Sequence, residues 1–247
     1  MISFFKKKSI SLRNLFNIKP VYINTTNIPE NTSVSDQFIW RTDSDYNTFF
    51  RFSDLLKLYF GSEENSFKLV ILNNMGDLIF SKKLNFNNNL EEINFKTILE
   101  NKKGYGTFSL FHFSDKKNFK NVIRNSCYTS FSYNNSLPSN VHGNVPVYYE
   151  KQGKLVSKII GNSIFCNNKY NLQDTFKNYE KSEIFISNPT SRKLKVYIND
   201  NKIILNKWSS AIYDVSNLST VSLYSNCYYL RPYIFKKNNN YIDVHHG

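Results

Sequence analysis

The chain has 247 residues, of which 40% are hydrophobic and 21% charged, so it is not a disordered protein and can form one large or two modest domains with buried cores. Its formal charge of +13 suggests an anionic partner in general terms. The lysines, however, are scattered in small clusters and accompany no helix-turn-helix, zinc-finger or RRM signature, so a nucleic-acid partner is not expected. No stretch approaches the length of an apolar transmembrane helix.

The composition favours amino acids that have AT-rich codons. The chain contains 36 Asn, 21 Phe and 17 Tyr but a single alanine, Ala211, and it contains 26 Lys against 6 Arg. A gene from an AT-rich genome explains this bias. The abundance of asparagine, lysine or tyrosine therefore supports no function by itself.

The first 35 residues form a basic segment with no acidic residue before Glu30. No uninterrupted apolar stretch follows its charges, so the segment does not have the form of a secretory signal peptide. We expect a mobile N-terminal tail over residues 1–35. A transit peptide, or an amphipathic helix that makes weak contact with a membrane surface, is the alternative.

From residue 36 onward, short strands and turns dominate the pattern. A first hairpin is expected over residues 67–86, with its turn at residues 74–77 and with Gly76 accepting a positive φ. Residues 107–113 alternate as another strand. Helix is scarce: the best segment is 53–61, in which Ser53 can cap the N-terminus and a glycine follows the last turn.

The second half of the chain repeats this pattern of short strands. Two hairpins are expected, over residues 145–160 and 194–205. In the second of them, leucine, valine and isoleucine alternate on one face while Lys195 and Tyr197 point away. Four more short strands are expected between residues 211 and 244.

These elements predict an all-β fold with few short helices. We expect two antiparallel β-sandwich domains, Ig-like or jelly-roll-like, over residues 36–130 and 145–247, because many short strands with frequent turns are typical of sandwiches. The polar segment 131–144 is the expected linker between them. One domain of two packed sheets is the alternative.

The three cysteines, Cys127, Cys166 and Cys227, are widely spaced and form no CxxC pair. This pattern fits neither a disulfide framework nor a zinc ribbon. We expect free thiols packed as small apolar groups, and a reducing compartment, the cytoplasm.

A metal site is one hypothesis for the C-terminus. Asp243 and His245 are two residues apart, so their side chains leave the same face of an extended strand, while His246 leaves the other. A carboxylate and an imidazole on one face form two thirds of a facial triad for a divalent metal, and His142 is the expected third ligand. The alternative is a frayed terminus, and we expect no cofactor.

Aromatic side chains are the second set of candidate binding residues. Rings exposed beside asparagine side chains can stack on sugars while the amides bind hydroxyl groups. The alternative is that AT-rich coding places aromatic residues in the core. The candidate ligand-binding residues are Trp40, Tyr148, Tyr149, Trp208, Tyr228 and Tyr229.

The nucleophile elbow GxSxG, the P-loop and GxGxxG are all missing from the chain, and no catalytic signature surrounds any cysteine. The leading hypothesis is a non-enzymatic binding or accessory protein that recognises a glycan or a protein ligand. A metal-dependent enzyme using Asp243, His245 and His142 is the alternative. A basic nucleic-acid-associated or viral structural protein is the second alternative.

Overall fold

The computed structural model describes residues 8, 9, 12, 15, 33–63, 65–84, 90–114, 127–134, 136–143, 146–151, 154–156, 168–173, 176–227, 230–239 and 241–247. Strands dominate this part of the chain, and every strand pairing within it is antiparallel. Its helical elements α2 (Leu55–Phe60), α3 (Phe95–Ile98) and the 3-10 turn η1 (Phe176–Asn178) are short. The prediction of an all-β antiparallel fold is confirmed. No helix in these ranges has the length and apolarity needed to cross a membrane.

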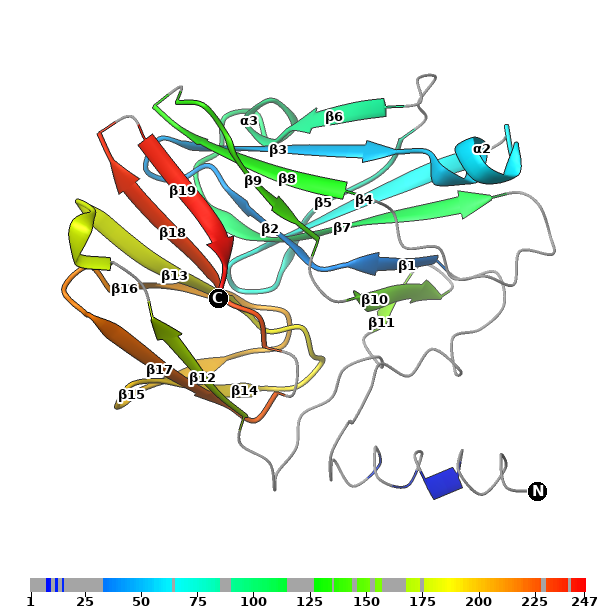
Figure 1. Ribbon diagram of the computed structural model, residues 1–247. Coiled ribbons are helices and arrows are strands. Elements are labelled where there is room, and N and C mark those ends of the chain that lie inside the picture. Colours follow the sequence, from blue (N-terminus) through cyan, green and yellow to red (C-terminus); the bar gives the residue numbers. More distant parts are fainter. Residues whose placement is uncertain are drawn as a thin grey trace.

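Four four-stranded sheets make up most of the molecule, and we name each after one of its central strands (Figure 1). The β4 sheet has the order β2-β7-β4-β5, from Phe38–Arg41, Tyr105–Ser114, Asn65–Asn73 and Leu78–Leu84. The β3 sheet has the order β6-β3-β8-β9, from Leu90–Asn94, Tyr46–Ser53, Cys127–Tyr133 and Ser139–His142. Both of these sheets come from the first 142 residues.

The other two four-stranded sheets come from the second half of the chain. The β13 sheet has the order β16-β13-β18-β19, from Ser210–Asp214, Lys181–Ser187, Tyr233–Asn238 and Tyr241–His246. The β14 sheet has the order β12-β17-β14-β15, from Asn168–Gln173, Thr220–Ser225, Leu194–Ile198 and Asn201–Leu205. A smaller sheet joins the halves in the order β1-β10-β11, from Ser33–Asp36, Pro146–Lys151 and Lys154–Val156.

Three clusters of buried apolar side chains hold the sheets together. The first lies between the β4 and β3 sheets around Phe50, the second between the β3 and β13 sheets around Phe131, and the third between the β13 and β14 sheets around Val196. The third also takes Val70 and Phe111 from the β4 sheet. Each sheet thus shares clusters with at least two others, and the four follow one another in a ring, like the blades of a propeller (Figure 1).

Two separate sandwich domains are not evident in this ring, because the second and third clusters contain side chains from both halves of the chain. The polar segment 131–144 contains the end of β8 and the whole of β9, which pair with each other inside the β3 sheet. Most of the N-terminal segment 1–35 lies outside the described residues, and its last residues, 33–35, belong to β1.

The predicted hairpins are confirmed in their described parts. Strands β4 and β5 pair across a turn in which Gly76 has φ of 86°, and β14 and β15 pair across a turn in which Asn199 has φ of 50°. Strands β10 and β11 also pair as predicted, although residues 152–153 of their turn lie outside the described residues. Hairpin pairing depends on neighbouring residues, which is why the sequence pattern predicts it well.

Helix α2 begins one residue later than predicted. Ser53 remains in β3, opposite Leu90, and Asp54 is the cap, its carboxylate accepting the backbone N–H of Lys57 at 2.9 Å. Gly61 ends the helix with φ of 60°, in the left-handed conformation that favours glycine. Because Ser53 pairs with Leu90 as part of β3, the helix begins after it.

The placement of two of the three cysteines agrees with the prediction of free, buried thiols. Cys127 and Cys227 are buried and form no disulfide within the described residues; Cys127 lies in the first cluster and Cys227 in the third. Cys166 lies outside the described residues.

Candidate functional site

The predicted pair Asp243 and His245 lies on one face of β19. The Nδ1 atom of His245 is 3.5 Å from Oδ2 of Asp243, as the two-residue spacing suggests. The same Oδ2 atom is 2.9 Å from the ammonium group of Lys236, which is 6% exposed. A buried lysine therefore already compensates the Asp243 carboxylate.

The structure brings His142 close to His246. Nε2 of His246 lies 3.1 Å from the backbone carbonyl oxygen of His142, a distance at which its N–H can donate. Burial of the imidazole lowers the pKa of His246 to about 4, and the charge of Arg231 acts in the same direction. Within the described ranges no three His, Cys, Asp or Glu residues gather as a metal-binding group, and the site of His142, Asp243 and His245 stays a prediction.

Of the six predicted aromatic binding residues, two can be placed. Trp40 is 3% exposed and belongs to the first cluster, and Trp208 is partly buried against the third. Tyr228 and Tyr229 lie outside the described residues, as do the side chains of Tyr148 and Tyr149 on β10.

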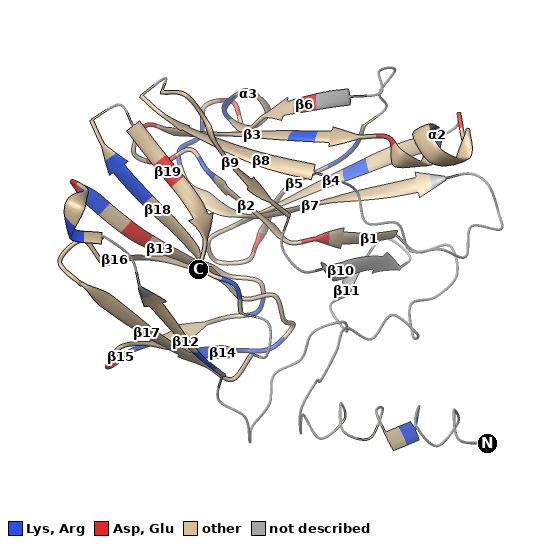
Figure 2. Cartoon of the chain, viewed as in Figure 1, with Lys and Arg blue, Asp and Glu red and all other residues tan. Residues whose placement is uncertain are grey.

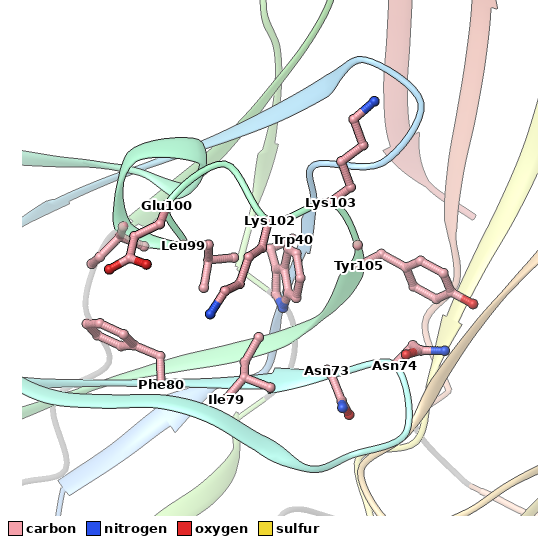
Figure 3. A pocket seen from close by; sticks show the side chains of 12 residues that line it. Trp40, Asn73, Asn74, Ile79, Phe80, Leu99, Glu100, Lys102, Lys103 and Tyr105 are labelled. Carbon is pink, nitrogen blue, oxygen red and sulfur yellow. The ribbon is translucent and has the colours of Figure 1, made fainter.

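Trp40 lines a pocket of about 580 Å³ at one open end of the first cluster (Figure 3). The pocket lies between strand β2, the β4–β5 hairpin and the loop that joins α3 to β7. Its lining residues are Trp40, Asn73, Asn74, Ile79, Phe80, Ile98, Leu99, Glu100, Lys102, Lys103, Gly104 and Tyr105. Its volume is within the range of small-molecule sites.

A hydrogen bond and a glycine fix the floor of this pocket. The indole Nε1–H of Trp40 donates to the carbonyl oxygen of Leu72 at 2.8 Å, which anchors the ring across the sheet. A Cβ atom at Gly104 would lie 3.3 Å from Cη2 of Trp40, closer than most such contacts. The absence of a side chain at Gly104 therefore allows the loop backbone to pass close to the indole.

The loop on the other side of the pocket begins as a Schellman motif at the end of α3. The backbone N–H of Glu100 donates to Thr97 at 3.1 Å, and that of Asn101 donates to Lys96 at 2.8 Å. Glu100 has φ of 52° and Asn101 has φ of 60°, so Glu100 occupies the position that usually holds glycine. Non-glycine residues in this conformation often occur at functional sites.

Charged and amide groups surround an apolar floor. Trp40, Ile79 and Phe80 supply the apolar surface, and the amide side chains of Asn73 and Asn74 lie at its edge. Figure 3 shows the Lys102 side chain directed into the pocket, whereas Lys103 points away. The hydroxyl of Thr42 donates to the carbonyl oxygen of Lys102 at 2.8 Å and fixes its backbone. This arrangement can bind a polar ligand that has one apolar face.

Arg41 follows Trp40 in the chain and lies in a charge network of its own. It is 1% exposed, and its guanidinium group donates to Asp43 and Glu183 at distances of 2.7–3.0 Å. The ring of Tyr46 lies 4.0 Å from its central carbon. Because protein groups surround the guanidinium group of Arg41, we interpret Arg41 as a structural residue and not as a ligand-binding residue.

Sequence patterns found Trp40 but not its pocket partners. Asn74 belongs to the predicted turn 74–77 and Asn73 directly precedes it, while Lys102 and Lys103 form one of the scattered lysine clusters. The signal that could have found them is the succession of a short helix, a polar turn and a glycine before β7. No protein-family model matches the chain, and no curated protein sequence matches it significantly.

Proposed function

We propose that this chain is a non-enzymatic binding protein whose ligand enters the Trp40 pocket, and that the ligand is a glycan or a sugar-sized part of one. The observation that carries the proposal is the pocket of about 580 Å³ with an aromatic floor and an amide and charged rim. A sugar ring combines apolar C–H faces with many hydroxyl groups, so this combination of lining residues suits it.

The lining residues favour binding over catalysis. Glu100 is the one acidic residue among the twelve that line the pocket, and none of them is histidine, cysteine or serine. Hydrolysis of a glycosidic bond generally needs two opposed carboxyl groups. The metal-dependent enzyme is a weaker proposal, because it requires a third ligand to approach Asp243 and His245.

Two proposals from sequence are independent of this site. One is the division of the chain into sandwich units 36–130 and 145–247, and the other is a cytoplasmic location. Limited proteolysis within 131–144 tests the division into two units. Two stable fragments would support it, whereas two halves that unfold together would overturn it.

Tryptophan fluorescence tests the pocket proposal directly. The chain has two tryptophans, so the variant Trp208→Phe leaves Trp40 as the one indole reporter. In that background we expect a panel of mono- and oligosaccharides to contain a ligand that shifts the Trp40 emission saturably. Lys102→Ala should weaken binding of that ligand, whereas Lys57→Ala, which removes an exposed lysine on α2, should not.

Two outcomes would overturn the proposal. The first is a panel in which no sugar changes the emission of Trp40. The second is saturable binding that Lys102→Ala and Lys57→Ala affect equally.

A further inference from the structure

A second surface, distinct from the Trp40 pocket, covers the outer face of the β14 sheet. Leu194, Val196 and Ile198 are each 0% exposed and point into the third cluster, so the residues between them on β14 face outward. Strand β17 alternates in the same way, with Val221 and Leu223 buried. One face of the sheet is therefore core, and the other is available to a ligand.

Two tyrosines lie side by side at the centre of this outer face. Tyr224 on β17 is directly opposite Tyr197 on β14, and these are the two central strands of the sheet. Tyr197 is 38% exposed, and Tyr224 is partly exposed. Side chains directly opposite on neighbouring strands are about 5 Å apart at Cβ, so the two tyrosines occupy adjacent positions on this face, and we call the pair the tyrosine platform.

A lysine lies at each end of the tyrosine pair. Lys169 on the edge strand β12 is opposite Tyr224, and Lys202 on the edge strand β15 is opposite Tyr197. Both lysines are exposed. The ammonium group of Lys169 is 5.2 Å from the centre of the Tyr224 ring. The row Lys169–Tyr224–Tyr197–Lys202 therefore crosses the whole sheet, with one residue from each strand.

The charge on this face has one sign. Strands β12, β14, β15 and β17 contain three lysines, Lys169, Lys195 and Lys202, and no aspartate or glutamate. In Figure 2 blue segments lie among these strands, although β17 has none, and red lies at the turn beside β15. The β3 sheet differs, because its exposed pair Arg51–Glu92 brings both signs together.

We propose that the outer face of the β14 sheet binds single-stranded nucleic acid. Unpaired bases stack on the rings of Tyr224 and Tyr197, and the lysines on both edge strands and on β14 contact the phosphates that flank them. Proteins that bind single strands combine aromatic stacking with a cationic track in this way. A neutral glycan would use the rings but would gain little from lysines on both sides.

The cation–π contact between Lys169 and Tyr224 fits this mechanism. In the free protein the ammonium group of Lys169 lies near the ring face that a base would occupy. An arriving base displaces it, and the freed ammonium group is then placed beside the phosphate of the same nucleotide. The formal charge of +13 favours the encounter with a polyanion.

Fluorescence anisotropy of the full chain with a labelled single strand of about 12 nucleotides tests the proposal, because such a strand spans sites of this type. The double variant Tyr197→Leu/Tyr224→Leu keeps apolar side chains but removes the aromatic rings, and we expect it to weaken binding about tenfold or more. Tyr197→Phe/Tyr224→Phe keeps both rings and should bind as the wild type does. A circular-dichroism melt confirms that each variant is folded.

Salt dependence separates the lysines of this face from the general charge of the protein. Lys202→Ala should weaken binding and reduce the slope of log K against log salt by about 0.7, the amount expected for one lost phosphate contact on a single strand. Lys57→Ala removes the same charge from α2 and should change the slope little. Lys102→Ala should leave this binding unchanged, which keeps the test independent of the pocket.

Three results would overturn the proposal: equal affinity of the leucine double variant and the wild type, equal losses in Lys202→Ala and Lys57→Ala, or duplex of the same sequence binding as tightly as the single strand. The last result would indicate charge without base stacking. Heparin that competes equally well against the wild type and the leucine double variant would lead to the same conclusion.

Discussion

The guanidinium group of Arg41 donates to the carboxylate of Glu183, with Nη1 2.8 Å from Oε2, and so connects β2 to a strand 142 residues further along the chain. Asp43 holds the opposite edge of the same guanidinium, with Oδ1 and Oδ2 at 3.0 and 2.7 Å. The arginine side chain is 1% exposed and that of Glu183 is 6% exposed. This ion pair joins the two halves of the chain inside the ring of sheets.

Removal of Arg41 should be strongly destabilising. We expect Arg41→Met to lower the free energy of unfolding by about 3–5 kcal/mol, because it leaves the buried carboxylate of Glu183 without its main partner. The matched control is Arg51→Met: Arg51 pairs with Glu92, but both side chains are at least 40% exposed, so the expected loss is below about 1 kcal/mol. Urea denaturation measures both, and equal losses would refute a special role for the buried pair.

The same network predicts a loss of stability in acid. Burial by itself would raise the pKa of Glu183, but the charge of Arg41 and hydrogen bonds from Lys181 and Arg41 outweigh it and hold the pKa below its ordinary value of 4.5. A carboxyl group whose pKa is lower in the folded state contributes stability above its unfolded pKa, and this stability is lost as the pH falls through the folded pKa.

Glu183→Gln should therefore be less stable than the wild type at neutral pH, and its stability should depend less on pH below about 4.5. Urea unfolding at a series of pH values from neutral to acidic gives both quantities. Curves that stay parallel for the two proteins over the whole range would show that Glu183 does not contribute to acid denaturation.

Gly76 lies where the β4–β5 turn closely approaches a loop from the second half of the chain. Its φ is 86°, and a Cβ atom there would lie 2.5 Å from the carbonyl oxygen of Lys207. Gly76→Ala should thus cost about 2 kcal/mol or more, from backbone strain together with a steric clash. Gly61 also has a positive φ of 60° but no atom within 4 Å of the new Cβ, so Gly61→Ala should cost about 1 kcal/mol. Thermal melts that rank the two variants in the reverse order would contradict this.

Glu100 occupies a strained position at the rim of the Trp40 pocket. With φ of 52° at the glycine position of a Schellman motif, Glu100→Gly should stabilise the fold by about 0.5–1 kcal/mol. Because the change also removes a carboxylate from the pocket, it should weaken the proposed sugar binding. Asn101→Gly, at φ of 60°, should gain less stability, since asparagine tolerates this conformation, and should keep binding. A Glu100→Gly variant that is more stable and binds normally would exclude a ligand role for Glu100.

Strand pattern and local turns account for what the sequence predicted correctly. Alternation placed Val196 inside and Tyr197 outside, and the turn residues around Gly76 and Asn199 located two hairpins. Alternation also separated His245, which lies beside Asp243, from His246, which lies beside the carbonyl of His142. Each of these features depends on residues a few positions apart.

The candidate sites were less predictable, because their members come from distant segments. The pocket at Trp40 needs the β4–β5 hairpin and the loop after α3, and nothing local indicates that these meet. The platform of Tyr197 and Tyr224 needs the pairing of β14 with β17, which are separated in sequence by β15 and β16. Six aromatic residues were singled out from sequence, and neither of these tyrosines was among them.

The sequence by itself determined that this protein is built from short antiparallel strands, since strand alternation and turn residues act over a few neighbours. The tertiary structure alone decided how the sheets close into a ring and where the lysines gather. Pairing between distant strands depends on which buried faces fit together, and the buried Arg41–Glu183 contact shows this across 142 positions of the chain. The sequence contains many lysines, and any one of them becomes part of a charged surface only when its strand pairs with the neighbouring strands of a sheet.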